Sequence, residues 1–367
     1  MTWRFFVQKF DWRLFFIVLA LISLSFATFY QLGPSANDIL ERQAILLVIG
    51  IVLLGLVAMF DYRIFKNYSA ASVILYSASV LLLGVVLFSE RIRGVSSWLS
   101  VGGFSFEPSE LAKLAVIILL AKYFSQKHAN IYDFRHIIAS GVYVLIPTFL
   151  VFIQPDLGSA VVFLMVWVVM LLASGIKRKH FLAIMLIGFL VVCVAWIAVL
   201  KPYQRTRITT FLDPYLDPRG EGYSLIQSKT TVGSGKIFGV LFQRDSGVQE
   251  GDEMPIPVLV PEPYTDFTFS MYAQRFGIVG IVVLMILFSL LIVRIRSIVL
   301  VANNNFAKLF AIGFFTFIMT HVFINSGMNI GLLPITGIPF SFLSYGGSHL
   351  MTLMIGLGII ESIKLHS

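Results

Sequence analysis

The sequence predicts an all-α, polytopic membrane protein with about ten transmembrane helices, and three observations support this fold class. Of the 367 residues, 58% are hydrophobic and only 13% are charged, and the mean hydropathy is +0.89. A soluble protein of this length needs far more polar surface. The apolar residues also come in blocks of roughly 17–25, the length of helix that crosses a hydrocarbon core of about 30 Å. The single cysteine, Cys193, lies inside such a block, which excludes a disulfide framework and a cysteine-based metal site.

The apolar blocks follow one another along the chain, and polar or helix-breaking residues bound most of them. The first block follows Arg4, Lys9 and Arg13 and has no small-residue cleavage site after it, so we expect a retained helix and not a signal peptide. The fourth block begins in FEPSELAKL, the sixth follows the turn QPDLGSA, and the eighth begins in PEPYTDF. The predicted spans are 14–32, 43–60, 70–88, 109–125, 137–153, 158–175, 180–200, 265–293, 306–327 and 345–363.

The cations divide unevenly between the two sides of this topology. The short loops on one side hold only Arg42, Arg91 and Arg93, whereas the opposite side carries most of the other lysines and arginines. The positive-inside rule therefore puts both termini in the cytoplasm. The formal net charge of +8 is a signal of topology, and we expect no nucleic-acid partner.

Two stretches depart from the pattern of spans and short loops. Residues 201–264 form a large polar loop on the extracytoplasmic side, between the seventh and eighth helices. A structureless loop of that length is usually functional or disordered, and its proline-rich part, 251–263, should be extended. Residues 327–348 are apolar but contain Pro334, Pro339 and several glycines, so they cannot form a continuous helix. Broken backbone at membrane depth needs protein or a cavity around it. We treat 1–367 as a single membrane domain.

Several familiar motifs are incomplete. The sequence GSGK, residues 233–236, lacks both the first glycine and the final Ser/Thr of a phosphate-binding loop. The six histidines show no metal-ligand spacing. Ser348 and His349 are adjacent, but no third partner is placed to make a catalytic triad.

The fourth span begins with charged residues that a helix cap explains only in part. Ser109 is a candidate N-cap, and Glu110 suits an acidic first turn. Capping does not explain Lys113, which lies a full turn inside an apolar segment, because an intramembrane cation is costly and usually functional.

Asp266 follows Thr265 at the predicted start of the eighth span, where a carboxylate suits the helix dipole. A cap alone would explain it. Together with charged residues at the outer ends of other spans, it could instead line a polar cavity that faces outward. Cations there could hold a phosphate, and a carboxylate could accept a proton. The other candidates for this cavity are Arg93, Glu110, Lys113, Asp156, Arg205, Arg207 and Lys229, of which Asp156 also suits a turn and a cap.

These motifs resemble those of the SEDS family (shape, elongation, division and sporulation) of bacterial wall polymerases. The resemblance covers nearly the whole chain, and the short N-terminus favours an elongation-type member over a division-type member. Five residues depart from the family pattern: Glu107 replaces Gln, Ser224 replaces Gln, Tyr264 replaces His, and Gln274–Arg275 replaces an acidic pair. The motifs that carry the resemblance are EPSELAKL, QPDLGSA, FLDPYLDPRGEGYSLIQS, VGSG, PEPYTDFTF and NSGMNIGLLPITGIPFSFLSYGGS.

The resemblance implies a peptidoglycan glycosyltransferase of the bacterial cytoplasmic membrane that polymerises lipid II for cell elongation and rod shape. Asp266 would be the general base of an inverting displacement, and Glu262 and Ser348 join the candidate substrate-binding residues. The resemblance also implies a class B penicillin-binding protein, a transpeptidase, as partner within an elongation complex. A divalent cation (Mg²⁺ or Mn²⁺) could assist the pyrophosphate, but no ligand cluster in the sequence identifies its site.

Two other functions fit the same composition. A lipid II flippase needs polar groups at both membrane faces, whereas the candidates here lie at the outer one. A non-catalytic scaffold of the wall-synthesis complex would need no carboxylate in a cavity.

Overall fold

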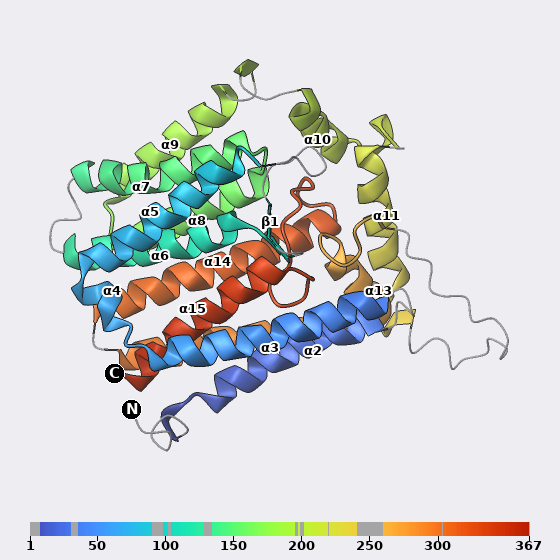
Figure 1. The fold of residues 1–367 in the computed structure, drawn as a ribbon. Coiled ribbons are helices and arrows are strands. Elements are labelled where there is room, and N and C mark those ends of the chain that lie inside the picture. The colour runs from blue at the N-terminus through green and yellow to red at the C-terminus, as the bar shows by residue number, and fades with distance from the viewer. Residues whose placement is uncertain are drawn as a thin grey trace.

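The computed structural model describes residues 8–30, 36–89, 98–101, 104–127, 134–194, 197–198, 202–218, 220–240, 260–302 and 304–366. Each of the ten predicted spans overlaps a helix in this part of the chain (Figure 1). Arg93 and most of the proline-rich stretch lie outside the described residues. The ten helices are α2 (Trp12–Tyr30), α3 (Asn37–Met59), α5 (Ser69–Val86), α6 (Pro108–Lys127), α7 (Phe134–Ile153), α8 (Leu157–Ala173), α9 (Arg178–Val194), α13 (Thr268–Val301), α14 (Asn305–Asn329) and α15 (Gly347–Leu365).

Seven of these helices, namely all but α6, α8 and α9, are long and apolar enough to cross a membrane. Helices α8 and α9 have 17 residues each, and α6 carries Glu110, Lys113, Lys122 and Lys127 within its 20 residues. The multi-pass, all-helical fold is confirmed, while the count of ten spans stays a prediction.

The two ends of the chain lie at the same end of the helical bundle (Figure 1). Asp11 precedes α2, and its carboxylate accepts a 2.9 Å hydrogen bond from Lys364 near the end of α15. The assignment of this end to the cytoplasm follows from the charge asymmetry of the loops.

Helix α15 forms the centre of the bundle. Over the most apolar 18 residues of each helix, 83% of the residues of α15 are buried, against 28% of those of α3 and of α5. It packs along α3, and α14 packs against both α6 and α8. The outer helices present large apolar side chains, such as Leu186 and Phe189 of α9, away from the protein. This arrangement is the one expected of helices that face lipid on one side.

The long polar loop contains regular structure. It includes α10 (Pro202–Leu212), the short 3₁₀ helix η3 (Pro214–Leu216) and α11 (Glu221–Ser234), and α11 packs against α13 (Figure 1). A structureless loop is therefore the wrong description for 202–234. The described chain also contains the short helix α4 (Arg63–Asn67) and a hairpin of β1 (Leu99–Val101) and β2 (Phe104–Phe106), in which Leu99 pairs with Phe106.

Helix α13 is interrupted at Gly277, whose φ of 64° and ψ of −161° are not helical. The segment after α11 satisfies the backbone there, because Ile278 N–H donates to Lys236 O at 3.0 Å and Val279 N–H donates to Ile237 O at 3.1 Å. The two chains approach closely: a Cβ at Gly239 would come within 1.9 Å of the Arg275 carbonyl oxygen. The interruption is therefore built from both segments, and glycine is required on each side of the contact.

Residues 331–346, called here the connecting segment, join α14 to α15 without helix, as the prolines and glycines predict. Ile338, Phe340, Phe342 and Leu343 are buried. Protein therefore covers this broken backbone, as a segment at membrane depth requires.

Candidate active site

Asp266 lies just before the start of α13. The helix begins at Thr268 and its N-cap position is Phe267, so Asp266 lies one residue before the observed cap and not at it. Its side chain is half-buried. The carboxylate points toward the connecting segment, since a Cβ at Gly337 would lie 3.5 Å from Asp266 Oδ2. Gly337 therefore lies beside this carboxylate.

Two asparagines hold the backbone of Asp266. The side-chain amides of Asn325 and Asn329 donate to the Asp266 carbonyl at 2.9 and 3.0 Å. Asn329 Oδ1 also accepts bonds from Ser270 N at 3.1 Å and Ser270 Oγ at 2.5 Å, and the Ser228 hydroxyl of α11 donates to Asn329 O at 2.7 Å. Asn329 therefore ties α11, α13 and α14 together below Asp266. Sequence reasoning missed both asparagines, although two amides four residues apart in an apolar span share one helix face.

The connecting segment fixes the turn that contains Asp266. The Ser344 hydroxyl donates to Thr265 O at 2.6 Å, and Tyr345 N–H donates to Tyr264 O at 2.8 Å. The Asn325 amide also donates to Ile338 O at 2.8 Å, so it bonds both the turn that contains Asp266 and the connecting segment. The carboxylate is therefore held on a rigid turn, which is the condition for a preorganised catalytic group.

Glu110 and Lys113 form a buried ion pair on α6. Lys113 Nζ lies 2.7 Å from Glu110 Oε1, and both residues are 1% exposed. They are buried and do not face an open outward cavity as expected from the sequence. The pairing explains how a cation persists inside an apolar span, because a buried charge must be paired.

The cap prediction for this helix is half right. Glu110 does lie in the first turn of α6. The N-cap role of Ser109 is wrong: α6 begins at Pro108, and the Ser109 hydroxyl donates to Glu107 Oε1 at 2.6 Å. Proline at the first helical position needs no hydrogen-bond partner, which suits the start of a helix.

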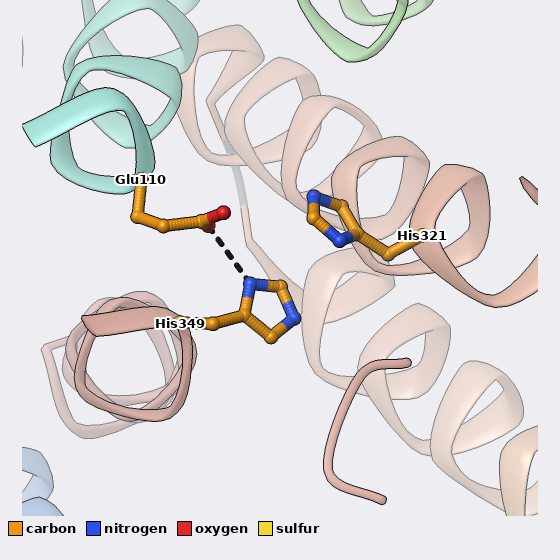
Figure 2. Close-up of side chains that lie close together, drawn as sticks. All are labelled: Glu110, His321 and His349. Atoms are coloured by element: carbon orange, nitrogen blue, oxygen red, sulfur yellow. Dashed lines mark hydrogen bonds and ion pairs between the residues drawn. The ribbon is translucent and has the colours of Figure 1, made fainter. Parts of the chain in front are cut away.

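Two histidines that sequence spacing dismissed join this ion pair. His349 Nδ1 lies 2.8 Å from Glu110 Oε2, and the rings of His321 and His349 stack with centroids 4.3 Å apart. Figure 2 shows that these side chains come from three different helices, α6, α14 and α15. His321 Nδ1–H donates to Pro339 O at 3.0 Å, which leaves Nε2 as an acceptor 3.4 Å from Lys113 Nζ. The cluster therefore reaches the connecting segment that borders Asp266.

The cluster resembles a metal site in composition, since ligand atoms of Glu110, His321 and His349 lie within 4.8 Å of one another. Lys113 Nζ, however, already lies against the Glu110 carboxylate and His321 Nε2, where a metal ion would have to bind. Imidazole ligands suit Zn²⁺, Cu²⁺, Fe²⁺ and Ni²⁺, whereas Mg²⁺ and Mn²⁺ favour oxygen ligands. These residues do not fit the expected Mg²⁺ or Mn²⁺.

Glu107 and Ser348 join β2, α6 and α15 beside this cluster. Glu107 N–H donates to Ser348 Oγ at 2.8 Å, so Ser348 supports the backbone at the entrance to α6. Burial, followed by repulsion from Glu110, raises the pKa of Glu107 to about 8.

The remaining predicted residues are spread around the outer end of the bundle. Asp156 is the N-cap of α8 and accepts from Ser159 N–H at 2.9 Å, as predicted. Arg205 of α10 donates to Ile197 O at 3.0 Å. Lys229 is exposed on α11 and lies against Gly331. Glu262 forms part of the turn before Asp266, where its carbonyl accepts from Phe267 N–H at 3.3 Å. Arg207 belongs to α10, but its side chain lies outside the described residues.

This geometry can support acid–base chemistry beside an anion. One half-buried carboxylate sits on a fixed turn at the outer end of a span, and Lys229 and Arg205 lie on the loop helices of the same region. A carboxylate so placed can accept a proton, and cations can stabilise charge on a departing phosphate.

The chain is similar to known proteins over nearly its full length. Residues 5–367 match the family described as cell cycle proteins, FtsW, RodA and SpoVE. A peptidoglycan glycosyltransferase, MrdB of Escherichia coli K12, is 33% identical over 97% of this chain and 94% of its own.

Solved structures show the same fold. A chain from a peptidoglycan synthase complex that coordinates polymerization and crosslinking has a TM-score of 0.81 and 31% identity, with 97% of both chains covered. The rod shape determining protein RodA of Thermus thermophilus has a TM-score of 0.71 and 27% identity, with 97% of this chain and 96% of its own covered. This chain belongs to the FtsW, RodA and SpoVE family of cell cycle proteins, the SEDS family that its motifs predict.

Proposed function

We propose that this chain is a peptidoglycan glycosyltransferase of the RodA type, which polymerises lipid II at the outer face of the inner membrane and serves cell elongation. The activity named for the E. coli relative MrdB supports the proposal, as does the fold shared with RodA of T. thermophilus. The membrane-spanning helices agree with a lipid-linked substrate.

The observation that carries the mechanism is the position of Asp266. Its carboxylate is half-buried at the outer start of α13, and Asn325 and Asn329 hold its backbone. We propose that Asp266 removes the proton from a sugar hydroxyl of the acceptor. The hydroxyl oxygen then attacks the anomeric carbon of the donor while the bond from that carbon to the pyrophosphate breaks. One displacement inverts the configuration, and the electron pair leaves with the polyprenyl pyrophosphate.

The leaving pyrophosphate needs positive charge nearby. Lys229 on α11 and Arg205 and Arg207 on α10 are the proposed contacts, and Arg93 is proposed from the sequence alone. Lys113 is paired with Glu110 and His321, so we assign it a positioning role: through His321 and Pro339 it supports the segment beside Asp266.

A class B penicillin-binding protein is the proposed partner within an elongation complex. The support is one structural neighbour, a chain of a peptidoglycan synthase complex in which polymerization and crosslinking are coordinated. A divalent cation remains a proposal from the chemistry of the pyrophosphate.

The test is polymerisation of purified lipid II by the purified chain, alone and with a cognate transpeptidase, with Mg²⁺, Mn²⁺ or a chelator. Glycan strands in either arm, absent from the Asp266→Asn protein, support the enzyme. Lipid II transport across vesicles without strand formation would favour the flippase. Wall synthesis in cells that persists with Asp266→Asn would favour the scaffold.

A further inference from the structure

A cavity of about 580 Å³ opens at the end of the bundle where both termini lie, far along α13 from Asp266. It is bordered by the residues before α2, the last turns of α13 and the end of α15. Among the residues that the structure describes, its lining contains three cations and no carboxylate: Gln8, Lys9, Arg294, Ser297, Ile298, Val301 and Lys364.

The buried carboxylate of Asp11 holds two of these three cations, Arg294 and Lys364, in place. Asp11 is 1% exposed, and its carboxylate accepts from Arg294 Nε at 2.9 Å and from Lys364 Nζ at 2.9 Å. Arg294 also donates to Ser297 Oγ at 3.3 Å. Burial opposes ionisation of Asp11, but the bonds from Arg294 and Lys364 outweigh it and lower its pKa. Asp11 therefore stays ionised and fixes the directions of both cations.

A second buried carboxylate belongs to the same framework. Glu361 Oε2 accepts from Asp11 N–H at 3.1 Å and does not line the cavity. The described lining of the cavity thus carries the three cations Lys9, Arg294 and Lys364. The two acids, Asp11 and Glu361, are buried and do not line it. An anion in the cavity would meet ammonium and guanidinium groups whose geometry is already set.

The depth of the cavity matches the headgroup layer of a membrane. Trp12, on the adjoining first turn of α2, is 44% exposed, and tryptophan is enriched at the membrane–water interface. After its interruption at Gly277, α13 continues to Val301, a length of about 36 Å, which exceeds a hydrocarbon core of about 30 Å. Val293 and Val301, beside and within the lining, are exposed apolar residues suited to acyl chains.

We propose that this cavity binds the phosphate headgroup of an anionic phospholipid from the inner leaflet. Lys9, Arg294 and Lys364 hold the phosphate, and Ile298 and Val301 contact the start of its acyl chains. The apolar part of the lining and the interfacial depth favour a lipid over a soluble phosphate.

The test is native mass spectrometry of the full chain in detergent, titrated separately with phosphatidylglycerol, phosphatidylcholine and inorganic phosphate. We expect the parent to bind one phosphatidylglycerol about tenfold more tightly than phosphatidylcholine, and Lys9→Gln to weaken it about fivefold, the usual contribution of one cation near anionic lipid. Adding Lys364→Gln should weaken it by a further factor of about five. Lys9→Gln leaves Arg294 and Lys364 bonded to Asp11. This variant therefore tests the site while the ion pairs of Asp11 stay intact.

Arg296→Gln is the matched control. Arg296 is exposed on the same helix but does not line the cavity, so its loss should change the affinity by about twofold or less. Equal losses in Lys9→Gln and Arg296→Gln, or equal affinity for the two lipids, would overturn the proposal. Inorganic phosphate that displaces phosphatidylglycerol and shows the same dependence on Lys9 would show a soluble-anion site, and the lipid assignment would be wrong.

Discussion

Asp266→Asn separates a catalytic carboxylate from a structural one, because it removes the base and keeps the shape. Asn325 and Asn329 donate to the backbone carbonyl of Asp266, so the substitution leaves these bonds in place. The N-cap position of α13 is Phe267, so the substitution costs no helix cap, although it removes the interaction of the charge with the helix dipole. That loss is about 0.3–1 kcal/mol at an exposed site, a shift of a few degrees at most in thermal unfolding.

Catalysis should respond far more strongly. An amide cannot accept the proton of the acceptor hydroxyl, and loss of a general base typically lowers the rate about 10²–10⁴-fold. The assay is the initial rate of lipid II polymerisation by purified protein at matched concentration, with thermal unfolding in the same detergent. We expect normal folding and a rate near background.

Asp156→Asn is the matched control for this experiment. Asp156 is a half-buried carboxylate that caps α8 through Ser159, and asparagine caps a helix about as well as aspartate. This variant should keep both stability and activity. The reasoning is refuted if Asp266→Asn polymerises at the parental rate, and Glu262→Gln would then be tested as the loss of an alternative base. Equal losses in the Asp156 and Asp266 variants would show a general effect of carboxylate removal.

Three other predictions concern the framework around the site. Asn329→Ala removes the buried side-chain bonds to Ser270 of α13 and to the Asp266 carbonyl, so it should lower the unfolding free energy by about 2–4 kcal/mol; thermal unfolding equal to the parent would contradict this. Lys113→Met leaves Glu110 charged and buried, at a cost of about 3–5 kcal/mol, whereas adding Glu110→Gln should recover most of it; an equally unstable double variant would show that the ion pair is not the cause. The raised pKa of Glu107, about 8 against an ordinary 4.5, means that the folded chain keeps a proton which the unfolded chain releases. Stability should therefore fall as pH rises through that window, by about 1.4 kcal/mol per pH unit at most. Glu107→Gln should remove this slope in unfolding curves measured at several pH values, and parallel curves would refute the assignment.

Hydropathy could predict the spans because lipid imposes a length and a composition on any helix that crosses it. The predicted start of the fourth span, residue 109, and that of the ninth, residue 306, each fall one residue from the observed starts of α6 and α14. The break between α14 and α15 was equally predictable, since Pro334 and Pro339 cannot continue a helix.

The site was harder to predict because its contacts join residues far apart in sequence. His321 and His349 are 28 positions apart and meet Glu110 only because α14 and α15 both lie against α6. No spacing rule describes that. The Glu110–Lys113 pair was within reach of the sequence, since residues three apart share one helix face. Helix α11 was also missed, because the polar composition of residues 201–264 favoured a loop over a helix.

The contact between the segment after α11 and the interruption in α13 also bears on where the chain tolerates insertion. Lys236 and Ile237 are bonded to α13 on one side of residues 241–259, and buried Val260 packs near Phe267 and Met271 on the other. Both ends of that stretch are therefore anchored to α13, one on each side of its interruption at Gly277. In general, each doubling of the length of a closed loop costs only about 0.6 kcal/mol of loop-closure entropy. An affinity tag or a small domain inserted between these anchors should therefore leave the supports of the Asp266 turn in place.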